Sequence, residues 1–210
     1  MEYYFFTKVF NCNYLKLHKF VKNTALENYF KKHKPFLLFL GKFLLSYLVL
    51  IFLYQLYLNQ FDAAKFQVDG ITQMVADQAG HILNFFDYKI MLQPHDSESS
   101  VRMYFNNVAI VRIIEGCNAV SVMILFVAFI IAFSGKFLQT TIYILFGVLV
   151  IHLLNVLRIT LLTMGLIHFK EYEHLMHDII FPLFIYGVVF GLWIIWVNKF
   201  SGYDKKNASK

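Results

Sequence analysis

The stretch EGCNAVSVMILFVAFIIAF, residues 115–133, places a cysteine directly before an apolar run that contains no charged residue from Val120 onward. Such a run predicts a membrane helix, with Cys117 at its entrance. The second cysteine of the chain, Cys12, lies in a lysine-rich segment that we expect on the opposite membrane face. No disulfide between the two is then possible, and Cys117 is predicted to be a free thiol.

A free thiol that faces an oxidising compartment is a liability unless it carries out chemistry there. The alternative is that Cys117 serves only as a small buried apolar side chain. The pattern around the cysteine leaves both readings open.

The composition of the 210-residue chain indicates an integral membrane protein, since 59% of its residues are hydrophobic and 19% are aromatic. Its net charge of +6 comes from lysines gathered at the two termini. A nucleic-acid-binding face would instead show a basic stripe with interleaved aromatic residues, so we read the charge as a topology signal and expect no nucleic-acid partner.

Four apolar runs predict four transmembrane helices, at residues 36–58, 119–133, 137–169 and 179–197. The fold class expected is therefore an all-α integral membrane protein. The third run would form a helix about 50 Å long, more than one straight span requires. We expect that helix to tilt, to break near Gly165, or to protrude from the membrane.

Lysines dominate the first 34 residues and recur after residue 198, so both termini are predicted to be cytoplasmic. The expected organisation is a basic cytoplasmic arm (1–35), a first membrane helix (36–58), an extracytoplasmic connection (59–116), a three-helix catalytic membrane core (117–198) and a basic cytoplasmic tail (199–210). The protein is expected in the cytoplasmic (inner) membrane, in contact with its lipid.

The extracytoplasmic connection contains a helical pattern and a hairpin signal. Apolar residues recur at roughly helical spacing between positions 68 and 86, which predicts an amphipathic helix along the outer membrane surface; they are Val68, Ile71, Val75, Ile82 and Phe86. Partial alternation in 89–92 and 101–114, with a turn at 94–97, suggests a small hairpin that leads to Cys117.

Ionisable residues inside membrane spans are costly, and they usually face a partner or a cavity. Arg158 is the clearest case, and Asn155 lies three residues earlier on the same helical face. An arginine that merely joins helices is the alternative reading. His177 and Asp178 precede the last apolar run, with His174 one turn earlier, whereas His152 is expected to be a satisfied core histidine.

The predicted topology brings Cys117, Arg158 and His177 to the same membrane face. A thiol, a guanidinium and an imidazole meet the requirements of cysteine acyl transfer. The imidazole accepts the thiol proton and later protonates the departing amine, and the guanidinium donates hydrogen bonds to the oxyanion or positions the substrate.

With these residues in this order, the sequence resembles the exosortase and archaeosortase family of membrane transpeptidases, and in particular the short F-type exosortases. The resemblance rests on residues 115–119 at a helix entrance, on Asn155 to Arg158 in the next span, and on His177 and Asp178 at the head of the last, and it covers roughly residues 101–199. It implies that Cys117 is the nucleophile, Arg158 the transition-state donor and His177 the third catalytic residue, with Asn118, Asn155 and His174 as supporting candidates.

The resemblance also implies the substrates, which are exported proteins with a C-terminal signal made of a short motif, an apolar helix and a basic tail. The chain departs from the family pattern in two respects. Many members have Ser-Gly after the cysteine, where this chain has Asn118 and Ala119, and many have more spans.

Three other functions remain as alternatives. A non-enzymatic assembly or scaffold subunit would use Arg158 and Asn155 to join helices. A metal or haem site would use Cys117 with His152, His174 and His177, but only the last two have a suitable spacing, so no metal and no cofactor is predicted. A transporter is disfavoured by the lack of internal repeats. The oligomeric state is left open.

Overall fold

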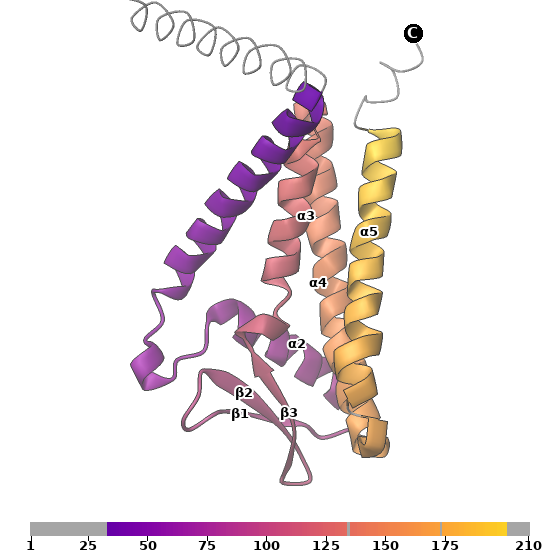
Figure 1. The fold of residues 1–210 in the computed structure, drawn as a ribbon. Coiled ribbons are helices and arrows are strands. Elements are labelled where there is room, and N and C mark those ends of the chain that lie inside the picture. Colours follow the sequence, from indigo (N-terminus) through magenta and orange to yellow (C-terminus); the bar gives the residue numbers. More distant parts are fainter. Residues whose placement is uncertain (1–32, 134, 173, 201–210) are drawn as a thin grey trace, which may run out of the picture. The chain divides into compact units, whose positions relative to one another are not determined.

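The computed structural model describes residues 33–133, 135–172 and 174–200. The predicted basic arm and basic tail therefore lie almost entirely outside the described residues. The chain divides into two compact units, Met1–Lys42 and Phe43–Lys210. The architecture below is that of the second unit, shown in Figure 1.

Among the described residues, three helices are long and apolar enough to cross a membrane, namely His33–Leu58, Phe137–His168 (α4) and Leu175–Lys199. The prediction of four such helices was wrong by this measure, because the second apolar run forms only the 13-residue helix Val120–Ala132 (α3). At 1.5 Å per residue, that helix is about 20 Å long, shorter than a hydrocarbon core. The last span begins as a π-helix, Leu175–Ile180, and continues as α5, Phe181–Lys199.

The structure is mostly helical but not all-α, which corrects the predicted fold class. A three-stranded antiparallel sheet, in the order β1-β2-β3, is formed by Met91–Pro94, Ser100–Phe105 and Val108–Ile114. The predicted hairpin is present between β1 and β2. A second tight turn follows at Asn106 and Asn107, which both have positive φ, and it divides the stretch that we had treated as one segment.

The predicted amphipathic helix is confirmed as α2, Gly70–Phe85, but a different face of it is buried. Its buried side packs against the sheet and α4 in one apolar core, and it is formed by Thr72, Val75, Ala76, Ala79, Gly80 and Leu83. Ile82 and Phe86, which we had placed on the apolar stripe, are exposed. The small residues of α2 allow this close packing, and apolar periodicity alone does not reveal them.

The long helix α4 is continuous past Gly165, so the break near Gly165, one of the three alternatives for this long helix, is absent. Its first half packs with α3 and α5 in a membrane-helix core that includes Tyr143 and Ile151. Its second half contributes Val156 and Ile159 to the core of α2 and the sheet. The extra length of α4 thus serves to join two cores.

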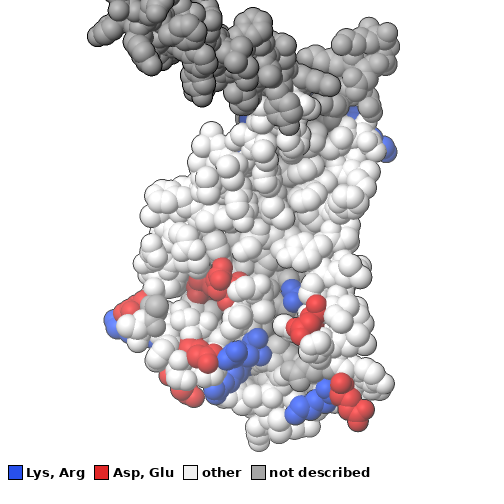
Figure 2. Space-filling model, in the orientation of Figure 1, with Lys and Arg blue, Asp and Glu red and all other residues white. Residues whose placement is uncertain are grey.

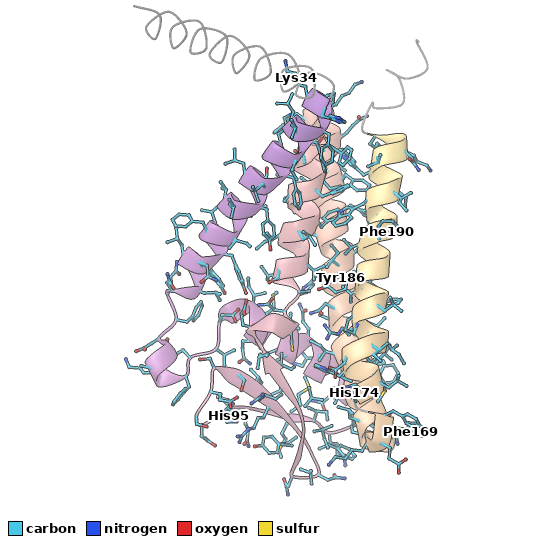
Figure 3. All side chains as sticks on the ribbon, viewed as in Figure 1. Lys34, His95, Phe169, His174, Tyr186 and Phe190 are labelled. Atoms are coloured by element: carbon cyan, nitrogen blue, oxygen red, sulfur yellow. The ribbon has the colours of Figure 1, made fainter. Side chains whose placement is uncertain are left out.

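Close packing between α3 and α4 depends on one glycine. A Cβ atom at Gly147 would lie 2.2 Å from the ring of Phe126, which is fully buried. Figure 2 shows charged side chains gathered at the lower end of the view, over α2, the sheet and the adjoining helix ends, whereas the helical surface above them is almost uncharged on this face. On α5, Tyr186 and Phe190 are exposed one turn apart (Figure 3), as lipid-facing residues of a membrane helix would be.

Candidate functional site

Cys117 lies in the turn that connects the sheet to the membrane helices. β3 ends at Ile114, the short 3₁₀ helix Glu115–Cys117 follows, and α3 begins at Val120 (Figure 1). The thiol is free and half-buried, and its side chain packs at the edge of the core formed by α2, the sheet and α4. Cys117 therefore sits at the junction of the two cores.

The backbone after Cys117 turns sharply. Ala119 is in the left-handed region, with φ 61° and ψ 10°, a conformation that favours glycine. The family pattern given above has glycine at this position, so the departure to Ala119 preserves the turn only by accepting some backbone strain.

Asn118 is buried, and its carboxamide holds this turn in place. Its Nδ2 donates to the Tyr54 hydroxyl at 2.9 Å and to Thr72 Oγ1 at 3.1 Å, and its Oδ1 accepts from the Val120 backbone N–H at 2.9 Å. Both amide hydrogens and the carbonyl oxygen are thus used. One side chain ties the first membrane helix and α2 to the start of α3.

Asn155 approaches the turn from α4. Its Nδ2 donates to the Cys117 carbonyl oxygen at 2.7 Å, so this residue of the predicted polar stripe contacts the cysteine. Asn155 is fully buried, and its Oδ1 has no hydrogen-bond partner among the described residues. Arg158, one turn along α4, is half-buried, and its Nε likewise lacks a partner in the described part of the chain.

His177 and His174 lie on the exposed side of the π-helical turn that begins the last span, and Figure 3 labels His174 there. Both bind the same carboxylate. His177 Nδ1 is 2.6 Å from Asp178 Oδ1, and His174 Nε2 is 3.2 Å from Asp178 Oδ2. A close approach of Met176 to Gly165 sets this turn against α4.

The structure thus joins Cys117 to Asn155 by a direct hydrogen bond, whereas His177 makes its hydrogen bond to Asp178. His152 is half-buried and pairs with Gln78 of α2 at 2.8 Å, as expected of a satisfied histidine. Among the described residues, no group of three His, Cys, Asp or Glu side chains is arranged to hold a metal ion.

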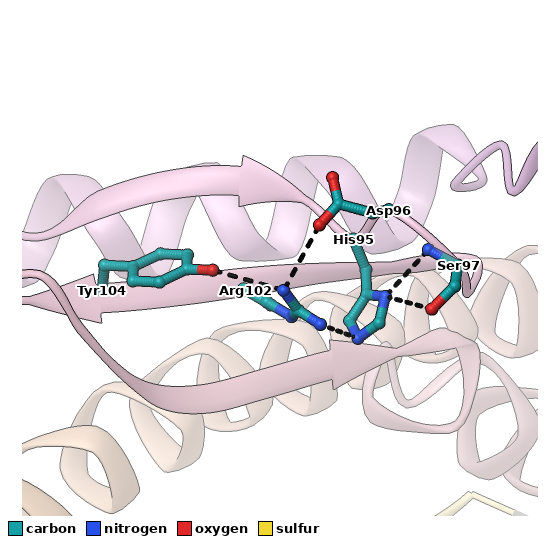
Figure 4. Close-up of polar contacts among 5 residues, drawn as sticks. All are labelled: His95, Asp96, Ser97, Arg102 and Tyr104. Atoms are coloured by element: carbon teal, nitrogen blue, oxygen red, sulfur yellow. Dashed lines mark hydrogen bonds and ion pairs between the residues drawn. The ribbon is translucent and has the colours of Figure 1, made fainter.

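A separate polar cluster lies at the β1–β2 turn (Figure 4). Arg102 contacts His95 and also lies near Asp96 (3.6 Å) and the Tyr104 hydroxyl (3.4 Å), while the Ser97 backbone N–H donates to His95 Nδ1 at 3.1 Å. All of its residues belong to one hairpin, and each of these contacts joins two residues of that hairpin. We assign this cluster to the stability of the hairpin.

Comparison with known proteins identifies the family. The model of the family described as transmembrane exosortase (Exosortase_EpsH) matches residues 36–197. The chain belongs to the transmembrane exosortase family. No match was found among curated proteins or among solved structures.

Membership in the exosortase family confirms the resemblance inferred from the sequence and extends its range. The match begins at residue 36, so it includes the first membrane helix, which our motifs did not reach. Exosortases are membrane transpeptidases that process sorting signals, and this exosortase is a multi-pass membrane protein with three candidate spans in the described part of the chain.

Sequence reasoning missed Tyr54 and Thr72 as partners of the residue after Cys117. Both are polar residues in otherwise ordinary helical patterns, and neither belongs to a recognised motif. The only available signal was the position of Tyr54 near the end of an apolar run, where tyrosine is common at a membrane interface in any case.

Proposed function

We propose that this exosortase is a cysteine transpeptidase that cleaves C-terminal sorting signals of exported proteins through a thioester on Cys117, at the extracytoplasmic face of the membrane. One observation carries the proposal. Asn155 donates to the Cys117 backbone carbonyl at 2.7 Å, which supports a site between the turn that carries the half-buried thiol and α4, the helix of Arg158.

In this mechanism, the Cys117 sulfur attacks the carbonyl carbon of the scissile peptide bond, and the carbonyl oxygen becomes an oxyanion. Arg158 donates hydrogen bonds to that oxyanion. The Nε of Arg158 has no partner among the described residues, which supports this role, because such a buried donor is suited to a group that is charged only during the reaction.

His177 is the proposed acid and base. It takes the thiol proton as the carbon–sulfur bond forms, and it returns that proton to the departing amine as the carbon–nitrogen bond breaks. Asp178 binds His177 Nδ1, so His177 Nε2 remains for the proton exchange. His174 instead contacts the Asp178 carboxylate through its own Nε2. Water or an amine then attacks the thioester and releases Cys117.

The substrate enters laterally from the bilayer in this proposal, so that its own membrane helix sets the position of the scissile bond. The half-buried setting of Cys117 beside the start of α3 supports such a route. Soluble peptides that lack an anchor helix should be processed poorly; equal processing of both would contradict lateral entry.

Mass spectrometry of C-terminal peptides from exported proteins tests the proposal most directly. Wild-type cells are compared with cells that express Cys117→Ala at the same level. We expect proteins with a C-terminal apolar helix and basic tail to retain that tail only in the variant. Identical C-termini in both strains would remove the catalytic role of Cys117 and leave the scaffold function.

The two histidines are separated by parallel substitution. His177→Ala should lower kcat by about 100-fold or more, the usual loss on removing a general acid–base group. His174→Ala, which leaves the contact between His177 and Asp178 intact, should have a much smaller effect. A larger loss in His174→Ala would transfer the role to His174, and full activity in both variants would exclude histidine catalysis.

A further inference from the structure

The first membrane helix is the least packed of the described membrane helices. No side chain between Phe43 and Leu58 is buried, although half-buried residues recur every three or four positions along one side of this segment; they include Phe43, Tyr47, Leu50, Tyr54 and Tyr57. Apolar packing within the described protein therefore fixes the helix only weakly. The polar contacts near its C-terminal end at Leu58 therefore contribute more to holding the helix in place.

Two tyrosines of this helix make polar contacts with the rest of the unit. Tyr57 accepts a hydrogen bond from the Ile71 backbone N–H at 3.2 Å, at the start of α2. Tyr54 accepts one from Asn118 Nδ2 at 2.9 Å, beside the nucleophile. The two rings stack 6.1 Å apart. Each tyrosine thus ties the helix to a different element.

Tyr54 contacts the residue that directly follows Cys117. Its oxygen accepts from Asn118 Nδ2, and Asn118 Oδ1 in turn accepts from the Val120 backbone N–H at the start of α3. The Tyr54 hydroxyl is therefore linked through one carboxamide to the turn that carries the thiol.

We propose that Tyr54, on the first membrane helix, is a positioning residue that holds Asn118, and with it the adjoining Cys117, in the geometry in which Cys117 reacts. The proposal rests on the proposed function, since it assumes that Cys117 is the nucleophile. Tyr54 acts through Asn118 and does not touch the reacting atoms. Displacement of a nucleophile by a fraction of an ångström lowers the rate of the chemical step more than it lowers substrate binding.

The connection is particular to this chain. The Asn118 carboxamide reaches Tyr54 and Thr72 and also caps the Val120 backbone N–H. A serine, which many family members have at this position, could still cap Val120 but would be too short to bridge to Tyr54. Asn118→Ser thus removes the hydrogen bond between residues 118 and 54 by changing its donor, whereas Tyr54→Phe removes its acceptor.

The chain offers a matched control. Tyr54→Phe and Tyr57→Phe each remove one hydroxyl from the same helix and keep both rings, but only the first breaks the contact with the nucleophile turn. We expect Tyr54→Phe to lower kcat about tenfold with KM unchanged, and Tyr57→Phe to stay within about twofold of wild type in both constants.

The experiment measures kcat and KM of the full-length protein in detergent, on a substrate identified by C-terminal mass spectrometry. Tyr54→Phe, Asn118→Ser and the double variant should show similar kcat values, since all three lose one shared link. If Tyr54→Phe fails to fold, Asn118→Ser alone tests the link. Wild-type kcat in Asn118→Ser or in Tyr54→Phe, or equal loss in Tyr57→Phe, would overturn the positioning role.

Cys117→Ala is measured alongside. An inactive Cys117→Ala beside a fully active Tyr54→Phe would overturn the role of Tyr54 and leave the proposed function standing. Activity in Cys117→Ala would overturn both.

Discussion

Two buried carboxamides, Asn118 and Asn155, meet at the turn that carries Cys117, one bonded to α2 and α3 and the other on α4, and their hydrogen bonding differs. Asn118 uses both amide hydrogens and its carbonyl oxygen within the protein. Asn155 uses its amide nitrogen on the Cys117 carbonyl, but its Oδ1 and the nearby Arg158 Nε have no partners among the described residues. On the side of the turn that faces α2 and α3, the Asn118 carboxamide makes all of its hydrogen bonds, whereas on the α4 side two buried polar atoms have no partner among the described residues.

This difference separates two tasks. A fully paired buried carboxamide stabilises one backbone geometry, because any movement leaves a polar group without a partner. Unpaired buried groups cost stability, and they are kept where a transient charge or a bound ligand uses them. We therefore propose that Asn118 fixes the turn and that Asn155 and Arg158 respond to the substrate.

The largest effect is expected on the α4 side. Arg158→Lys keeps the positive charge but loses the planar fork of donors, so kcat should fall about 100-fold or more, as on removal of an oxyanion donor. Steady-state kinetics in detergent give the value, and thermal unfolding serves as the folding control. Wild-type kcat in Arg158→Lys would return the arginine to a role in helix packing.

The second prediction compares the two carboxamides by replacing each with leucine, which has a similar volume. Asn118→Leu should lower the free energy of unfolding by roughly 2–3 kcal/mol, because the Val120 N–H, the Tyr54 hydroxyl and Thr72 all lose a partner. Asn155→Leu should cost about 1 kcal/mol, since one carbonyl loses its donor while an unpaired acceptor is removed.

Thermal unfolding of both leucine variants in the same detergent gives this ranking, and kcat is measured in parallel. Asn155→Leu should lose more activity than its small loss of stability explains. A larger destabilisation in Asn155→Leu than in Asn118→Leu would show that the two sides of the turn have been assigned the wrong way round.

The sequence predicted the α4 side better than the α2–α3 side, for a physical reason. Arg158 and Asn155 stand out because polar residues are expensive in an apolar helix, and helical spacing puts them on one face. The contacts of Asn118 join it to Tyr54 and Thr72, which are 64 and 46 residues away. No local pattern contains such pairings.

The same reasoning applies to the fold. Long apolar runs predicted the three spans because length and hydropathy decide them locally. The sheet was predicted only in part, since its strands are short and the Asn106–Asn107 turn was not recognised. The packing face of α2 was misjudged because alanine and glycine, rather than large apolar residues, form its contact with the sheet and α4.

The smallest effect is expected at Ala119, whose left-handed backbone conformation is strained for a residue with a side chain. Ala119→Gly removes the cost of a left-handed residue, about 1–2 kcal/mol. It also increases the conformational entropy of the unfolded chain and removes a methyl group from the membrane-helix core. These two costs together nearly cancel the gain. The free energy of unfolding should change by less than about 1 kcal/mol. Ala119→Val, which forces a branched side chain into the same conformation, should destabilise clearly more. Comparable unfolding temperatures for the glycine and valine variants would mean that Ala119 does not need its left-handed conformation, and that Asn118 alone fixes the turn.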